Sequence, residues 1–361
     1  MGNFPYVEIE GTPFEIGFQH GELFKDKILN SIQCYKEMFM DYSNLEWSRA
    51  KKLSTRFVEV IRDYNPDYLE EIRGVAEGSG LDFEDILALN CRSELVFVGN
   101  ELDKADGGCT SIGISSDAGA GGDAFLAHNW DWKTSQRESM IMMKITQKNG
   151  RPTIFMVTEA GIIGKTGFNS AGVGLYLNAL STDQAPKGLP LYMAMRGILD
   201  CETLAEAVKA ATRFQLGCCA NFMIGHKNGE CVDIEIENEE FDVLYPKDGI
   251  IVHTNHFISS RLPILPRKDM GKRKFTDSFV RLGRADKLLR KKGSEISEED
   301  IKAVLTDHVE YPSSICRHDD EKLEKGLRMG TVFSMIINLT KGEILFCKGN
   351  PCELEYEKYR I

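Results

Sequence analysis

The hydrophobic positions follow two different patterns on either side of residue 109. Before it, apolar residues recur at the three- and four-residue spacing of a helix with one buried face, for example at Ile16, Phe24, Ile28, Ile32 and Met38. This spacing predicts helices over 13–42, 68–77 and 83–98, the last with Asp82 as its N-cap. After residue 109, short β-branched and aromatic runs between glycine-rich turns predict strands.

The second part of the chain is predicted to alternate sets of strands with pairs of helices. The expected strands are 110–115, 124–132, 139–146, 153–159, a stretch with several glycines over 161–178, 221–226, 230–237, 241–245, 250–254 and a final hairpin of 331–338 and 343–347. The expected helices are 191–200, 203–213, 275–291 and 297–308, with Ser297 capping the last. This order of blocks favours an α+β fold in which antiparallel sheets pack between helices.

Composition and charge exclude several classes of partner. The 361 residues carry a net charge of −11, which argues against nucleic acid or an anionic membrane surface. The basic stretch 267–292 is interpreted as a solvated helix face. The first residues have no signal-peptide pattern, no apolar run approaches the ~20 residues of a membrane span, and a cytoplasmic location is expected. The ten cysteines contain no Cys-x-x-Cys pair, so reduced thiols without a structural zinc are expected.

One short run of residues contains a candidate nucleophile. In Asp106-Gly107-Gly108-Cys109-Thr110-Ser111, glycine leaves the carbonyl before Cys109 unshielded, and the thiol can attack it. Hydrolysis of the resulting thioester would free Cys109 as a new N-terminus. Its α-amine, with a pKa of about 7.7–8.0, would then serve as the base for its own thiol. Taken alone, the run also fits an ordinary tight turn.

A set of ordered motifs decides between these interpretations. The chain resembles the acyl-coenzyme A:6-aminopenicillanic acid (isopenicillin-N) acyltransferase family of N-terminal-nucleophile hydrolases. The matching runs are 11–17 (GTPFEIG), 71–74 (EIRG), 108–110 (GCT), 129–131 (NWD), 158–165 (TEAGIIGK), 168–173 (FNSAGV), 178–180 (NAL), 253–256 (HTNH), 311–312 (YP) and 314–317 (SICR).

The resemblance implies a four-layer αββα sandwich and a proenzyme cut between Gly108 and Cys109. Fragments 1–108 and 109–361 would stay associated as one catalytic unit. Cys109 would be the nucleophile, and Asp131 would orient its freed α-amine. Asn255 would stabilise the oxyanion, and Arg317 would hold Asp131 and lower the pKa of the thiol.

Further residues are expected to bind substrate or support the site: Asn178, His128, Asn129, Glu159, Ser170 and His253. His128 stands where relatives often carry Gln or Arg, which predicts a different acyl preference. The His253-x-x-His256 spacing lacks a nearby third ligand, so no metal is expected there. No cofactor is expected either.

The expected activity is cleavage of a small N-acyl amide, penicillin-like or an N-acyl amino acid or amine, through a thioester on Cys109. The acyl group would pass to water or to an amine, and acyl-coenzyme A is a possible co-substrate. The signature of papain-type proteases is absent. An unprocessed, non-catalytic binding scaffold of the same fold is the alternative, and the oligomeric state is left open.

Overall fold

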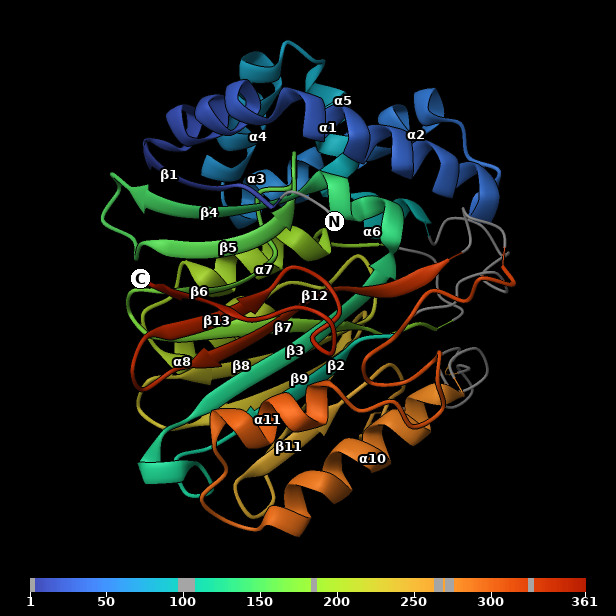
Figure 1. Ribbon diagram of the computed structural model, residues 1–361. Helices are drawn as coiled ribbons and strands as arrows, with labels where there is room; N and C mark the ends of the chain where they lie inside the picture. The colour runs from blue at the N-terminus through green and yellow to red at the C-terminus, as the bar shows by residue number, and fades with distance from the viewer. Residues whose placement is uncertain (1–3, 97–107, 183–186, 263–268, 270–275, 324–327) are drawn as a thin grey trace.

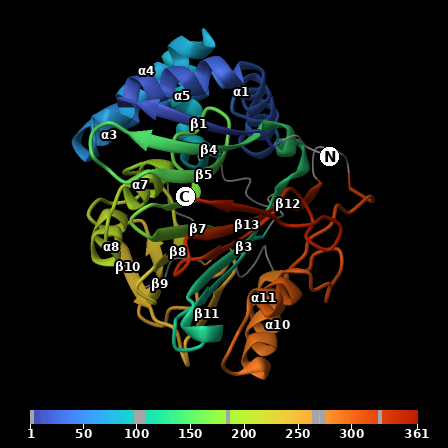
Figure 2. The same cartoon turned by 60° about the vertical axis from the view of Figure 1, so that its left-hand side comes forward.

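The computed structural model describes residues 4–96, 108–182, 187–262, 269, 276–323 and 328–361. Two sheets face each other between two layers of helices (Figures 1 and 2). This is the αββα arrangement expected from the sequence. Among the described residues, none of the helices is both long and apolar enough to cross a membrane.

One sheet has eight strands in the order β1-β4-β5-β6-β7-β8-β9-β10. The strands are β1 (Tyr6–Gly11), β4 (Met140–Gln147), β5 (Ile154–Glu159), β6 (Thr166–Asn169), β7 (Val173–Ala179), β8 (Ala220–His226), β9 (Cys231–Glu237) and β10 (Glu240–Leu244). Its pairs are antiparallel as predicted, except that β1 runs parallel to β4. The sequence analysis did not predict β1, which joins the first part of the chain to the second.

The other sheet has six antiparallel strands in the order β11-β2-β3-β12-β13-β14. They are β2 (Thr110–Ile114), β3 (Phe125–Lys133), β11 (Ile250–His253), β12 (Met329–Asn338), β13 (Glu343–Cys347) and β14 (Glu357–Arg360). Ser111 lies opposite His128 on one side and His253 on the other. The strand β2, second from the edge of this sheet, therefore brings the segment after Cys109 between two predicted site regions.

Helices cover the outer face of each sheet. On the eight-stranded sheet lie α1 (Pro13–Ser43), α7 (Leu191–Leu199) and α8 (Leu204–Thr212). Around α1 pack α2 (Trp47–Ser54), α3 (Val58–Tyr64), α4 (Asp67–Ser79), α5 (Phe83–Asn90) and α6 (Arg92–Val96). On the six-stranded sheet lie α10 (Asp277–Lys292) and α11 (Glu298–Leu305). The helix predicted over 83–98 is thus two helices that break at Cys91, with 97–98 outside the described residues.

Strand alternation divides the buried apolar residues that the structure describes into three large cores, beside a small cluster around Phe257. One lies between the N-terminal helices and the eight-stranded sheet, a second between the sheets, and a third beneath α10 and α11. In β2, Ile112 and Ile114 belong to the third core, whereas Cys109 belongs to the second. Because side chains alternate along a strand, Ser111 faces the same way as Cys109, into the space between the sheets.

The close approach of α1 to α4 explains two of the matching runs. A Cβ at Gly17 would lie 2.0 Å from the carbonyl oxygen of Glu71, and one at Gly74 would lie 2.2 Å from that of Phe14. Only glycine allows the two helix backbones to touch in this way. The predicted cap at Ser297 is present as a full capping box. Asp82 precedes α5 but makes no capping bond, because its carboxylate pairs with Lys51 at 2.7 Å.

Candidate active site

Cys109 lies immediately before β2 and is 6% exposed. Its Sγ is 3.9 Å from the backbone carbonyl oxygen of Asp131. Burial, and then the negative charge of Asp131, raise the pKa of the Cys109 thiol to about 12. In the uncut chain the sulfur is therefore a neutral thiol.

Gly108 is held in a space that admits no side chain. A Cβ there would lie 2.0 Å from Nη2 of Arg281 and 2.9 Å from Oδ1 of Asn255. The Arg281 guanidinium also donates to the carbonyl oxygen of Cys109 at 2.6 Å and to Oδ1 of Asn255 at 3.0 Å. The Arg281 cation thus packs against Gly108 and bonds the carbonyl oxygen of the next peptide, between Cys109 and Thr110. Gly107 lies outside the described residues.

A buried chain of charges joins this peptide to Asp131. Asp277 accepts from Nε of Arg281 at 2.8 Å and also from Arg317. Nε of Arg317 lies 3.6 Å from Oδ2 of Asp131. Burial raises the pKa of Asp277, but Arg281 and Arg317 outweigh it and lower that pKa overall. Arg317 therefore stands between two carboxylates, one of them the predicted partner of the α-amine.

Asp131 keeps one carboxylate oxygen unused. Oδ1 accepts from the Thr331 hydroxyl at 2.7 Å, while Oδ2 has no hydrogen-bond partner among the described residues. Burial outweighs the cations and raises the pKa of Asp131 to about 7. A buried carboxylate oxygen without a donor is costly. The Nε of Arg317, which also lacks a hydrogen bond, lies 3.6 Å from this oxygen and offsets part of that cost through its charge.

Asn255 follows β11 and is 1% exposed. Its backbone N–H donates to the Ser278 hydroxyl at 2.8 Å, and its Nδ2 donates to the carbonyl oxygen of Ala179 at 3.1 Å. Together with the bond from Arg281, these contacts fix the side-chain amide beside Gly108. The structure thus brings Cys109, Asp131, Asn255 and Arg317 into one network centred on Arg281 and Asp277.

A second polar group lies between the sheets next to Ser111. The Ser111 hydroxyl contacts Oδ1 of Asn178, and it lies 2.8 Å from Nδ1 of His128. The His128 ring stacks on Tyr176 with centroids 4.9 Å apart. Burial, and then the charge of Lys165, lower the pKa of His128 to about 3. The His128 ring is therefore neutral near neutral pH and does not act as a general acid.

His253 belongs to a buried acidic group. Its Nε2 lies 2.7 Å from Oε1 of Glu235 and 4.0 Å from Asp233. Burial lowers the pKa of His253, but these two carboxylates and the Thr254 carbonyl outweigh it and raise that pKa overall. The His253 carbonyl oxygen also accepts from Asn178 at 3.4 Å. His253 thus braces Asn178 through the backbone.

Glu159 connects the site to the N-terminal helices. It pairs with Lys165 and with Arg92 at 3.2 Å, and it accepts from the Tyr35 hydroxyl at 2.6 Å. The Nζ of Lys165 lies 3.5 Å from the centroid of the Trp130 ring. Burial raises the pKa of Glu159, but Lys165 and Arg92 reverse this and lower it to about 2. Glu159 is an anion that holds Lys165 toward the inter-sheet core.

Two predicted support residues lie away from the thiol. Nδ2 of Asn129 donates to the carbonyl oxygens of Leu305 and Ile315, so this side chain ties α11 and the following loop to β3. Ser170 is exposed in the turn after β6, where its hydroxyl accepts from the Thr153 N–H at 3.0 Å. Ser170 therefore supports that turn and contacts none of the residues around Cys109 described above.

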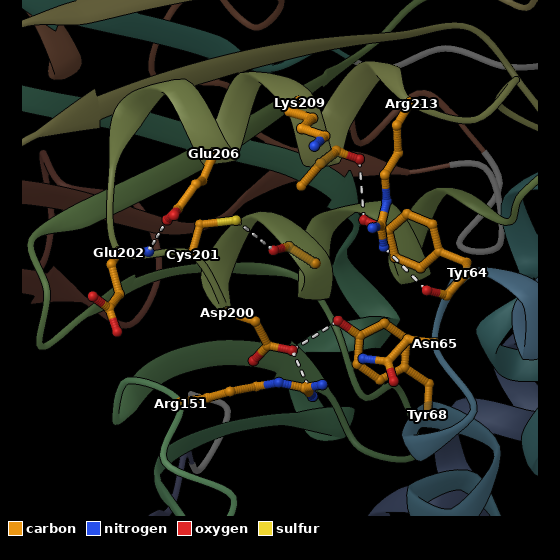
Figure 3. Close-up of a pocket in the computed structure, with 12 residues that line it drawn as sticks. Tyr64, Asn65, Tyr68, Arg151, Asp200, Cys201, Glu202, Glu206, Lys209 and Arg213 are labelled. Atoms are coloured by element: carbon orange, nitrogen blue, oxygen red, sulfur yellow. Dashed lines mark hydrogen bonds and ion pairs between the residues drawn. The ribbon is translucent and has the colours of Figure 1, made fainter.

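A surface pocket of about 390 Å³ lies elsewhere, between the N-terminal helices and α7–α8 (Figure 3). Two of the arginines that line it contact neighbouring lining residues. Arg151 meets Asp200 at 3.3 Å, and Arg213 stacks on Tyr64 at 4.1 Å. None of the predicted site residues lines it. This pocket is separate from the candidate active site.

The comparisons with known proteins show the family of the chain. A family model described as acyl-coenzyme A:6-aminopenicillanic acid acyl-transferase matches residues 118–353. The chain belongs to this family. The acyl-coenzyme A:6-aminopenicillanic-acid-acyltransferase 40 kDa form of Emericella nidulans is 32% identical over 336 residues, 92% of this chain and 89% of the relative.

Three further similarities are more limited. A β-alanyl-dopamine/carcinine hydrolase of Drosophila melanogaster is 28% identical over 87 residues, 24% of this chain and 22% of that protein. Among solved structures, a mutant of the conjugated bile acid hydrolase of Clostridium perfringens covers 70% of this chain and 97% of its own at 13% identity and a TM-score of 0.45. The penicillin V acylase of Agrobacterium tumefaciens covers 66% and 83% at 12% identity and a TM-score of 0.40.

Sequence reasoning missed Arg281, the cation that packs against Gly108. The stretch 267–292 was expected to be a solvated helix face, and this is wrong for Arg281, which is 1% exposed. A signal was available, because Arg281 shares the helical spacing of the buried residues Ser278, Ala285 and Leu289. Lys165 was also missed as a buried cation, although it lies in a matching run.

Proposed function

We propose that this protein is a self-cleaving enzyme with an N-terminal cysteine that transfers an acyl group from a small N-acyl amide to water or to an amine. Membership of the acyltransferase family supports acyl chemistry in general. The relatives' names include an acyltransferase and an amide hydrolase, so both acceptors occur among similar proteins. The finer claims are self-cleavage, the thioester and the substrate, and they rest on the residues around Cys109.

The first step is the cut. The Cys109 thiol attacks the carbonyl carbon of Gly108, the carbon–nitrogen bond breaks, and the thiol proton moves to the nitrogen. The product is a thioester on Sγ with a free α-amine. Water then hydrolyses the thioester, which leaves a carboxylate on Gly108 and restores the thiol. Arg281 and Asn255 hold the peptide while this occurs, and the missing side chain of Gly108 leaves the carbonyl open.

The observation that supports this proposal most directly is that Oδ2 of Asp131 accepts no hydrogen bond, although Arg317 lies 3.6 Å from it. Before the cut, the nitrogen of Cys109 is an amide and carries no charge. After the cut it becomes an amine, and its protonated form would donate to that oxygen. An added cation beside the thiol would also lower the pKa of Cys109, which burial holds at about 12 in the uncut chain. Cleavage would therefore create the base and activate the nucleophile together.

Turnover repeats the same chemistry on a substrate. The α-amine takes the thiol proton, Sγ attacks the acyl carbon, and the protonated amine returns the proton to the leaving nitrogen. The acyl group remains on Sγ as a thioester until water or an amine attacks it. We assign stabilisation of the oxyanion to Asn255, a role that mutagenesis elsewhere values at about 2.7–4 kcal/mol. His128 and Asn178 would border the acyl group, since both contact Ser111.

Water, an amine and acyl-coenzyme A all use the same residues, so the acceptor and the natural acyl group are matters for experiment. Thioester trapping read by mass spectrometry, with N-acyl amino acids, N-acyl amines, penicillins and acyl-coenzyme A, identifies the donor. An acyl adduct on Cys109 with at least one of these is the expected result.

The competing function is a binding scaffold of the same fold that remains one chain. Intact mass separates the two on freshly purified protein. We expect two fragments, 1–108 and 109–361, which elute together. A single chain whose Cys109 also resists thiol alkylation would overturn the enzyme proposal.

A further inference from the structure

Two cysteines and two histidines converge outside the candidate active site, in the loop after α11 and the turn after β13. The four side chains belong to His308, Cys316, His318 and Cys352, and their ligand atoms all lie within 4.8 Å of one another. Nε2 of His318 is 3.1 Å from Nε2 of His308 and 3.3 Å from Sγ of Cys352. Sγ of Cys316 is 3.5 Å from Sγ of Cys352 and 3.7 Å from Nε2 of His318.

These separations are those of a tetrahedral zinc shell. Zinc bonds of about 2.3 Å to sulfur and about 2.0–2.1 Å to nitrogen give tetrahedral edges of about 3.8 Å between sulfurs, about 3.3 Å between nitrogens and about 3.5 Å between unlike atoms. The four measured edges of 3.5, 3.1, 3.3 and 3.7 Å each fall within a few tenths of an ångström of these values. The two remaining edges, which join His308 to the two sulfurs, are at most 4.8 Å long, so a movement of the exposed His308 ring closes the shell around an ion.

We propose that His308, Cys316, His318 and Cys352 bind one zinc ion. Binding converts two thiols into thiolates, and their two protons leave to the solvent. The two thiolates balance the two charges of the ion, and the imidazoles bind as neutral ligands through Nε2.

The surroundings fit such a site. Nδ1 of His318 faces Oε1 of Glu353 at 3.6 Å, the position of the outer carboxylate that commonly orients a metal-bound histidine. Nδ2 of Asn350 lies 3.6 Å from Sγ of Cys316 and donates to it. His308 and Cys352 are exposed, so an ion can reach the site from solvent.

The ligands also flank a residue of the candidate active site. Arg317 lies between Cys316 and His318, and its carbonyl oxygen accepts from Nδ2 of Asn350 at 2.7 Å. Zinc would join the loop that carries Arg317 to the turn at 350–353. Its role would be structural, because all four positions are filled by protein and none is open to substrate.

The sequence analysis expected no structural zinc because no Cys-x-x-Cys pair occurs. The four residues span 308–352, and only the pairing of β12 with β13 brings the turn after β13 back to this loop. The usual short spacing is absent although the four-residue shell is complete.

The test uses the full-length protein, purified with a reductant that does not bind metals. We expect one zinc per chain by native mass spectrometry. Replacement with cobalt(II) should give the thiolate charge-transfer band and the strong visible bands of a tetrahedral sulfur-ligated site. The uncut Cys109→Ala chain should bind equally well, so failure of the proposed enzyme function would leave this result unchanged.

Two variants and one control locate the ion. Cys352→Ser and His308→Ala change exposed side chains, and each should weaken zinc binding by more than the about 10- to 100-fold typical of outer residues. Cys34→Ser, a partly exposed cysteine on α1, should keep the wild-type affinity. Unchanged affinity in Cys352→Ser, absence of bound zinc, or a disulfide between Cys316 and Cys352 in the reduced protein would each overturn the proposal.

Discussion

Replacing Gly108 by alanine tests the geometry of the cut. The new Cβ would lie 2.0 Å from Nη2 of Arg281, 2.7 Å from its Cζ and 2.9 Å from Oδ1 of Asn255. Separations this short are not found in real structures, so Arg281 or the Gly108 backbone must move. Arg281 is itself fixed by bonds to the Cys109 carbonyl and to Asn255.

The size of the effect follows from those bonds. A hydrogen bond from a charged group is worth about 1.5–3 kcal/mol. If the displaced guanidinium loses one such bond in the transition state, the cut slows by about 10- to 150-fold, because about 1.36 kcal/mol corresponds to a factor of ten. Loss of both bonds would slow it further.

Cell-free translation provides the assay, since it yields uncut chain at the start and the cut fraction can be followed by intact mass. Gly283→Ala is the matched control. It makes the same change on α10, two residues after Arg281, and no atom lies within 4 Å of the new Cβ. We expect Gly283→Ala to cut at the wild-type rate. If Gly108→Ala also cuts at that rate, the contact between Gly108 and Arg281 has no part in the reaction.

Three further predictions concern the nucleophile, the buried cation and pH. The Cys109→Ala chain should stay uncut and inactive, with an intact mass of about 40.6 kDa, whereas the Cys109→Ser chain should cut slowly. A Cys109→Ala chain that still divides after residue 108 would disprove self-cleavage by this thiol. Arg281→Met should lower the free energy of unfolding in urea by about 3 kcal/mol, which is the lower end of the cost of breaking a buried ion pair. We expect the lower end because Arg317 still pairs with Asp277. A loss below about 1 kcal/mol would contradict the buried network. The pKa of His128 is lowered from 6.5 to about 3, so below pH 6.5 the unfolded chain binds a proton that the folded chain does not. The stabilisation that comes from this neutral histidine is complete above pH 6.5, and the free energy of unfolding falls by up to about 1.4 kcal/mol per pH unit toward pH 3. His128→Gln should reduce that slope in urea unfolding, and an equal slope would refute the lowered pKa of His128.

Local pattern was enough to predict most of the fold. Most strands after residue 109 show runs of β-branched residues between turns, and the structure has them within a residue or two of the predicted bounds. The predicted stretch 161–178 is instead two strands, β6 and β7, and β14 was not predicted. β1 was missed because its six residues gain their partner only from β4, more than a hundred residues later. Such a strand is decided by tertiary pairing rather than by its own composition.

The candidate site was predictable where its residues lie in matching runs. It was not predictable where only tertiary packing brings a residue to the site. Cys109, Asp131, Asn255 and Arg317 stand in such runs, and the structure gathers them. Arg281 lies in a basic stretch whose positive charge suggested exposure to solvent. Only the packing of α10 against the six-stranded sheet buries its side chain. Ser170 lies in a matching run but supports only a turn, so its place in such a run did not indicate a residue of the site.

The integration of the first 108 residues would have a consequence if the chain is cut after Gly108, as proposed. β1 pairs with β4, and Tyr35 and Arg92 bond Glu159 across the proposed cleavage point. Before cleavage, folding is unimolecular and its equilibrium does not depend on protein concentration. After cleavage, the same contacts become an interface between two polypeptides, and the denaturation midpoint should rise with concentration by mass action. The uncut chain would recover from denaturation at any dilution, whereas the mature pair, once separated, would have to find its partner again.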